Sequence, residues 1–240
     1  MQVTENKKVL ADDIYRQIKG QIMDQAFQPG KRLNIEALAV EMNVSPTPVR
    51  ESLARLAAER LVTSEPFKGY SVNQPLNSHQ VADLMHVRRL IELEAVRIAA
   101  RRIMFPELMM LEENLSQERQ HYGQSWAAGY QGFNQLDQKF HEGLIAAADN
   151  PYLLDAYQSL NIHVLLARFH PSFEDGDHTD TCDEHNAILQ ALKNHNAEAA
   201  ALAIEAHLRN TEIRIFGFQN HLQTLNPTIN KSLSETFQNH

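Results

Sequence analysis

The chain has 240 residues, of which 43% are hydrophobic, enough for one large domain or two small ones. Its one cysteine excludes an internal disulfide and any zinc motif built from several cysteines, which favours a reducing cytoplasm. The sequence contains no long apolar run, so we expect no contact with a membrane. The net charge of −8 argues by itself against a nucleic-acid partner. The charge is uneven, however: residues 1–75 hold 10 Lys plus Arg against 9 Asp plus Glu, whereas the remainder holds 12 against 21.

The first predicted element is a helix from about Val9 to Phe27, which ends before the turn pair Pro29-Gly30. A second, short helix is predicted from Asn34 to Met42. Asn34 can cap its first turn, and Asn43 suits the left-handed residue that often ends a helix. The first helix is expected to be scaffold, and the second to brace the helix that follows it.

The stretch from Val44 to Leu56 predicts a helix that begins abruptly. Ser45 can cap its free amides, and prolines follow at positions where a helix has no intrahelical amide bond to lose. An apolar stripe with four- and three-residue steps is formed by Val49, Leu53 and Leu56. Off that stripe, free to meet a partner, lie Thr47, Arg50 and Arg55. Helix, short turn and capped helix form the helix-turn-helix pattern of DNA-binding proteins.

Two short strands are predicted next, at 61–64 and 70–72, with a turn at 66–69 between them. This hairpin makes the module a winged helix-turn-helix. The following stretch, 72–78, has no periodicity and contains proline and asparagine, as a connector does. We therefore predict a winged domain at 1–75 and a second domain at 76–240.

From Ser78 onward the pattern is helical, with no stretch that alternates with period two. The breaks predict six helices, at 78–103, 107–121, 126–148, 151–169, 180–194 and 197–220. The predicted fold is thus mostly α, a winged helix-turn-helix followed by an all-α antiparallel helical bundle.

Four polar residues stand on apolar helix faces of this bundle: Asp137, His141, His185 and His207. Burying them is costly unless something satisfies them together. A divalent metal bound by one carboxylate and three imidazoles would do so and leave positions open for water or an anion. The alternative is that each histidine is a hydrogen-bonded core residue. Five further histidines lack a carboxylate at helical spacing on an apolar face and are set aside: His163, His170, His178, His195 and His221.

The N-terminal pattern resembles the winged helix of GntR-type bacterial transcription regulators. The matching positions are Tyr15, Ile18, Ile22, Pro29-Gly30, Leu33, Val44-Ser45, Thr47 to Glu51, and Gly69. The resemblance implies that palindromic double-stranded operator DNA is contacted by Ser45, Thr47 and Arg50, with Lys68 and Gly69 reaching a groove edge. One position departs from the family: many members have an arginine, which commonly helps to read guanine, where this chain has Pro46.

The remainder of the chain is similar to the FCD domain, the helical effector domain of the FadR subfamily. The resemblance rests on Asp137-x-x-x-His141, Asn150-Pro151, His185 and His207. In that domain the matching aspartate and histidines commonly bind zinc, nickel or manganese, and zinc is the first expectation. The pattern Arg88-x-x-x-Glu92 also matches, and the family's arginine tends to meet the carboxylate of a small effector. A surface ion pair explains Arg88 and Glu92 equally well. A count of six bundle helices suits the VanR-like branch.

Two function classes follow. The first is a metabolite-responsive DNA-binding regulator, a homodimer and by resemblance a repressor. The second is a metal-dependent enzyme of the hydrolase type with a DNA-binding head, since an open metal position can activate water. The sequence shows no general base beside the four candidate ligands, no glycine-rich phosphate loop and no nucleophile motif, which favours the regulator.

Overall fold

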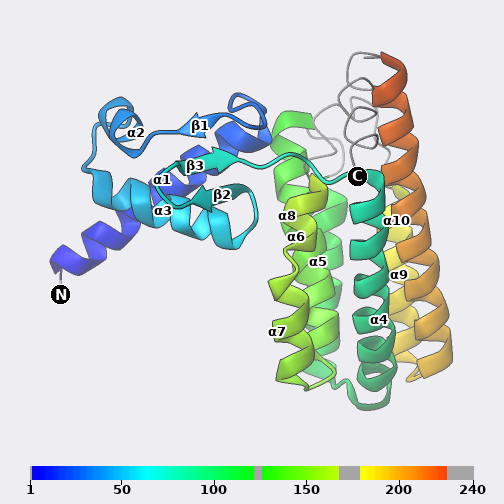
Figure 1. The fold of residues 1–240 in the computed structure, drawn as a ribbon. Coiled ribbons are helices and arrows are strands. Elements are labelled where there is room, and N and C mark those ends of the chain that lie inside the picture. The colour runs from blue at the N-terminus through cyan, green and yellow to red at the C-terminus, as the bar shows by residue number, and fades with distance from the viewer. Residues whose placement is uncertain (1, 122–125, 168–178, 226–240) are drawn as a thin grey trace. The chain divides into compact units, whose positions relative to one another are not determined.

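The computed structural model describes residues 2–121, 126–167 and 179–225 of the chain (Figure 1). The chain divides into two compact units, Met1–Leu76 and Asn77–His240, each with its own core. Among the described residues, no helix combines the length and the apolar character needed to cross a membrane.

The N-terminal unit is a winged helix-turn-helix, as predicted. Its elements are α1 (Gln2–Met23), β1 (Arg32–Leu33), α2 (Ile35–Glu41), α3 (Pro46–Ala58), β2 (Val62–Glu65) and β3 (Gly69–Val72). The three strands form an antiparallel sheet in the order β1-β3-β2. The hairpin of β2 and β3 was predicted from the sequence, but β1 was not. Two residues are too few to show a period, and β1 exists because it pairs with a strand far along the chain, Leu33 opposite Tyr70.

Local sequence explains where α2 and α3 begin. Asn34 caps α2, since its side chain accepts a hydrogen bond from the amide of Ala37 at 2.9 Å. Ser45 occupies the corresponding position before α3, but its side chain makes no capping hydrogen bond to the described residues. The prediction that Ser45 caps the helix was therefore wrong. Pro48 stands third in the helix and has no amide proton, so one of the two amides that a capping side chain can use is missing.

The core of this unit lies between α1 and α3. Val49, Leu53 and Leu56 are fully buried, as their spacing predicted, and Ile18 of α1 is buried with them. Ser52 is buried beside them, and its hydroxyl lies 2.8 Å from the carbonyl of Pro48 and 3.0 Å from that of Ala11. The face of α3 opposite this core is left for solvent or a partner.

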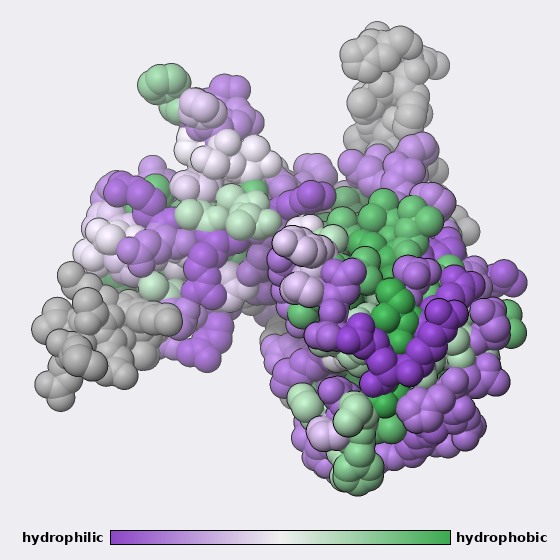
Figure 2. Space-filling model, turned by 90° about the horizontal axis from the view of Figure 1, so that it is seen from below, coloured by the Kyte–Doolittle hydropathy of each residue, from purple (hydrophilic) through white to green (hydrophobic). Residues whose placement is uncertain are grey.

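The C-terminal unit is an all-helical bundle (Figure 1). Its helices are α4 (Ser78–Arg102), α5 (Phe105–His121), α6 (Trp126–Ala146), α7 (Pro151–Ser159), α8 (Ile162–Ala167), α9 (Thr179–Lys193) and α10 (Ala197–Leu225). Helix α4 packs against α10 and α6, and α5 packs against α6 and α9. Figure 2 shows hydrophobic residues on the end of the bundle where α4 turns into α5, among hydrophilic ones.

The single helix predicted at 151–169 is wrong, because the structure breaks it into α7 and α8. Asn161 stands between the two with φ of +51°, a left-handed conformation that asparagine adopts more readily than most residues. The described part of the bundle therefore contains seven helices and not six. Elsewhere the helix ends follow local signals, such as the Asn77 and Gln80 capping box that starts α4.

Candidate functional site

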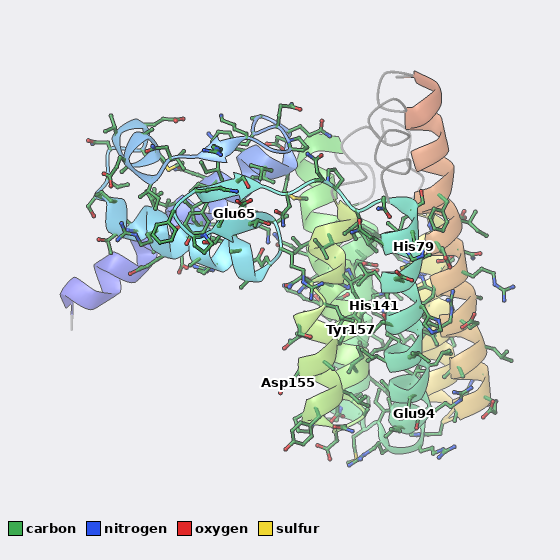
Figure 3. The ribbon with its side chains drawn as sticks, viewed as in Figure 1. Glu65, His79, Glu94, His141, Asp155 and Tyr157 are labelled. Atoms are coloured by element: carbon green, nitrogen blue, oxygen red, sulfur yellow. The ribbon has the colours of Figure 1, made fainter. Side chains whose placement is uncertain are left out.

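The four residues singled out in the bundle sequence come together in the structure. Asp137 and His141 are supplied by α6, His185 by α9 and His207 by α10. Each offers one ligand atom, and these four atoms all lie within 4.8 Å of one another. The three imidazoles are buried, and Figure 3 shows His141 inside the bundle. We call this set the His3Asp cluster.

The spacing of the donor atoms suits a single small cation. The Oδ1 atom of Asp137 lies 3.5 Å from Nε2 of His185 and 3.8 Å from Nε2 of His141. The Nε2 atoms of His141 and His207 are 3.2 Å apart. Ligands at about 2.0–2.2 Å from one metal ion lie about 3–3.5 Å from each other, so only small adjustments separate this arrangement from a coordination shell.

A glutamate holds the outer nitrogen of each ring. The distances from Nδ1 to the nearest carboxylate oxygen are 2.7 Å for His141 and Glu92, 2.8 Å for His185 and Glu118, and 2.8 Å for His207 and Glu184. A carboxylate can only accept, so Nδ1 carries the proton and donates it. In a neutral ring Nε2 then has a lone pair, and all three lone pairs face the centre of the cluster.

This arrangement leaves the centre rich in acceptors. The Nε2 atom of His185 is buried and has no hydrogen-bond partner among the described residues. Buried acceptor atoms without a hydrogen bond are costly. A divalent cation bound to all four side chains would satisfy their acceptor atoms at once. The donor set of three imidazole nitrogens and one carboxylate oxygen is one that zinc and related transition metals accept. The residues present therefore fit a metal ion.

The pKa values of His141 and His207 favour the neutral imidazole, which is the form with a free lone pair on Nε2. Burial lowers the pKa of His141 to about 3 and that of His207 to about 4, so both rings stay neutral near pH 7. Burial would raise the pKa of Asp137, but its hydrogen bond to His163 holds that pKa well below the ordinary value. Neutral imidazole and ionised carboxylate are the forms that bind metals.

His185 behaves differently. Burial opposes its protonation, yet the adjacent carboxylate of Glu118 leaves the pKa of His185 raised. A proton on Nε2 of His185 is thus the natural competitor of a metal ion for this cluster.

Arg88 and Glu92 are both buried, so the surface ion pair considered from the sequence is excluded. The Nε atom of Arg88 lies 2.5 Å from Oε1 of Glu92, and each side chain is 2% exposed. Burial opposes the charge of Arg88, but Glu92 keeps the pKa of the guanidinium raised. The Nη2 atom of Arg88 is buried and finds no partner in the described part of the chain, so it remains available to an anion.

His163, which no pattern in the sequence selects, is not one of the four candidate ligands but contacts one of them. Its Nδ1 atom lies 2.8 Å from Oδ2 of Asp137, whereas His141 and His185 lie nearest the other oxygen, Oδ1. The carboxylate comes from α6 and not from a neighbouring turn, so helical spacing gave no signal. Of the other histidines set aside, His195 contacts the carbonyl of Ala100 at 3.0 Å, while His170 and His178 lie outside the described residues.

The glutamates behind the cluster also escaped the sequence analysis. Glu118 and His185 are 67 residues apart, and Glu184 and His207 are 23 apart, so neither pair appears in a helical pattern. Glu184 is itself held by Arg214, whose two terminal nitrogens lie 2.9 Å from its two oxygens. Hydrogen bonds from His207 and Arg214 outweigh burial and lower the pKa of Glu184 to about 2.

The residues predicted to meet DNA lie on the N-terminal unit. Ser45, Thr47 and Arg50 are exposed at the start of α3. Lys68 is exposed in the turn between β2 and β3, 2.8 Å from Glu65, and Gly69 begins β3 with φ of +82°. Figure 3 labels Glu65 at this turn.

Arg55 is not free, contrary to the sequence analysis. Its guanidinium pairs with Asp12 and lies 4.0 Å above the ring of Tyr15. Both partners belong to α1, so Arg55 joins α3 to α1.

Comparison with known families settles the kind of protein. Residues 10–72 match the bacterial regulatory proteins of the gntR family, and residues 83–210 match the FCD domain. The chain belongs to the GntR family. This GntR protein is a transcription regulator with a DNA-binding GntR domain and an FCD effector domain, and both families consist of transcriptional regulators, not enzymes. The hydrolase alternative is thereby set aside.

Relatives agree with this assignment. The GntR protein is 28% identical over 183 residues to the Nta operon transcriptional regulator of Aminobacter aminovorans, covering 76% of this chain and 83% of the relative. It is 30% identical over 200 residues to the transcriptional repressor RspR of Escherichia coli, covering 82% and 84%. Its fold is similar to the structure of E. coli McbR/YncC, with a TM-score of 0.70 and 20% identity over 87% of this chain and 97% of that one. The FCD domain fits the FadR-like subfamily of this family. The predicted count of six bundle helices, which favoured the VanR-like branch, is wrong, because the described part of the bundle has seven.

Proposed function

We propose that this GntR protein represses transcription by binding a palindromic operator as a homodimer, and that a small carboxylate releases it. In this proposal the His3Asp cluster holds a divalent metal ion, zinc first and nickel or manganese as alternatives, and Arg88 pairs with the effector's carboxylate. Repression is supported by the similarity to RspR, which is a repressor. A homodimer suits a palindrome because one winged helix covers a single half-site.

One observation carries the metal part of the proposal: three imidazole Nε2 atoms converge on Oδ1 of Asp137 while each Nδ1 is held by a glutamate. A histidine that only fills the core needs a hydrogen-bond partner. It has no need of two further histidines whose ring nitrogens point at the same place. A divalent ion there would supply open coordination positions for a carboxylate oxygen. The buried, unpartnered Nη2 of Arg88 offers the second contact that such an anion requires.

The DNA part rests on the exposed start of α3. Arg50 lies outside the buried stripe of Val49, Leu53 and Leu56, so its guanidinium can reach a base edge or a phosphate. Ser45 and Thr47 are exposed one turn earlier and can donate to phosphates. Lys68 and Gly69 are assigned to the groove edge on the strength of the family pattern.

The test begins with a duplex selected by the wild-type protein from a random-sequence library. Wild type, His185→Ala and His207→Ala are compared for bound metal and for release of that duplex by a panel of small mono-, di- and tricarboxylates. The control is His79→Ala, the same replacement at a histidine that is exposed on α4. We expect the cluster variants to lose both metal and carboxylate response, and the control to lose neither. Unchanged metal content would refute the site, and a carboxylate response without metal would refute the mechanism.

A further inference from the structure

The two oxygens of Asp137 face different groups. Oδ1 faces the cluster, 3.5 Å from Nε2 of His185. Oδ2 lies 2.8 Å from Nδ1 of His163, which is not one of the four candidate ligands. A carboxylate with both oxygens free can bind a metal through one oxygen or through both, so the hydrogen bond to His163 restricts this choice.

His163 is itself held from behind. Its Nε2 atom lies 2.8 Å from the hydroxyl of Tyr157, and both side chains are buried. Asp137 can only accept, so Nδ1 of His163 donates to it, and Nε2 of the neutral ring then accepts from the tyrosine hydroxyl. Burial raises the pKa of Tyr157 well above its ordinary value, and the neighbouring carboxylate of Glu92, which also hydrogen-bonds to this hydroxyl, acts in the same direction, so the phenol keeps its proton. The chain of Tyr157, His163 and Asp137 therefore has a donor and an acceptor at each step.

The break between α7 and α8 makes this chain possible. Six residues separate Tyr157 from His163, and in one continuous helix their side chains would point about 120° apart. The left-handed residue Asn161 ends α7 and lets α8 start in a new direction, so that both side chains reach the same place. Figure 3 shows Tyr157 inside the bundle, in contrast to Asp155, which lies on its outer side.

We propose that His163, held by Tyr157, is a positioning residue that restricts Asp137 to offering the single oxygen Oδ1 to the metal. This inference rests on the proposed metal site. Partners that orient a ligand typically contribute 10–100-fold to metal affinity. Loss of the His163 hydrogen bond allows the carboxylate to rotate, which lowers affinity and changes the number of oxygens on the metal.

The experiment uses the full-length protein and three variants. His163→Leu removes the contact to Asp137, Tyr157→Phe removes the hydroxyl that contacts both His163 and Glu92, and His163→Asn keeps an N–H donor near the position of Nδ1. Zinc affinity is measured by competition with a chelating indicator, and the visible spectrum of the Co2+ form reports the coordination. Circular dichroism establishes that each variant is folded and gives its melting temperature. A substitution that acts only on stability lowers the melting temperature without changing zinc affinity or the Co2+ spectrum.

We expect His163→Leu to bind zinc roughly 10–100-fold more weakly than wild type and to show an altered Co2+ spectrum. Tyr157→Phe should change the zinc affinity and the Co2+ spectrum in the same direction as His163→Leu, but by a smaller amount. His163→Asn should keep most of the wild-type zinc affinity. Wild-type affinity and spectrum in both His163→Leu and Tyr157→Phe would overturn the inference while leaving the metal site in place, provided that His185→Ala still abolishes binding. If the wild type binds neither zinc nor nickel nor manganese, the proposed site and this inference both fail. If His163→Leu does not fold, Tyr157→Phe and His163→Asn decide the question.

Discussion

Glu92 joins His141 to the buried Arg88. One of its oxygens lies 2.7 Å from Nδ1 of His141, and the other lies 2.5 Å from Nε of Arg88. Its pKa is held below the ordinary range because the charge of Arg88 outweighs the burial that would raise it. A single carboxylate thus connects the candidate metal ligand with the candidate effector contact, so the two sites should respond to the same substitution.

The first prediction concerns this pair. Glu92→Gln leaves the buried guanidinium of Arg88 without a negative partner, which should cost about 3 kcal/mol of unfolding free energy. Urea denaturation of the metal-free protein measures the loss. Glu94→Gln, an exposed change on the same helix, should stay within about 0.5 kcal/mol of wild type. Equal effects of the two substitutions would contradict the buried pair.

The second prediction concerns metal removal. A ligand that binds only the folded protein stabilises it by about 2.7 kcal/mol when present at a hundred times its dissociation constant. Zinc should therefore raise the melting temperature of the wild type, and a chelator should lower it again. In His185→Ala neither addition should matter. A chelator effect that survives in this variant would place the metal elsewhere.

The third prediction concerns pH. His207 takes up a proton near pH 6.5 in the unfolded chain but only near pH 4 in the folded one, because burial disfavours its charged form. Stability is thus fully present above pH 6.5 and is lost as the pH falls toward 4, on the order of 3 kcal/mol in total. His141 acts with the same sign, and its loss continues to about pH 3.

The measurement compares wild type with His207→Gln, both free of metal, by denaturation at several pH values. Glutamine does not titrate, so the variant should lose less stability than the wild type between pH 6.5 and 4. Parallel curves would show that His207 does not have the lowered pKa.

The fourth prediction concerns DNA. Arg50→Ala should lose roughly 1–3 kcal/mol of specific binding to the selected duplex if its guanidinium makes a bidentate contact to a base. Arg55→Ala is the matched control in the same helix, since Arg55 already pairs with Asp12 and should matter less for specificity. Salt-controlled mobility shifts compare the two. If Arg50→Ala binds like the wild type, Arg50 is not part of the interface.

The fifth prediction concerns assembly. One chain has a mass of 27.3 kDa, and a palindromic operator requires two heads. Light scattering at micromolar concentration should therefore give twice this mass, with and without DNA. A single chain under both conditions would contradict the homodimer.

Local features of the sequence determined the winged helix and the ends of most bundle helices. The apolar stripe of α3, with Val49, Leu53 and Leu56, follows from side chains three and four residues apart. The same reasoning put Asp137 and His141 on one face of α6. Interactions of this kind reach no further than about one helical turn, so the residues themselves display them.

Only the tertiary structure decided what surrounds the cluster. Glu118 meets His185 from 67 residues away, and Glu92 meets His141 from 49, because packed helices bring their faces together. His163 acquired its carboxylate only through the break at Asn161, a conformation that asparagine tolerates but does not require. Likewise, nothing local distinguishes a buried Arg88 from a surface one. Periodicity shows which residues share a face, whereas the partner of that face depends on how the helices pack.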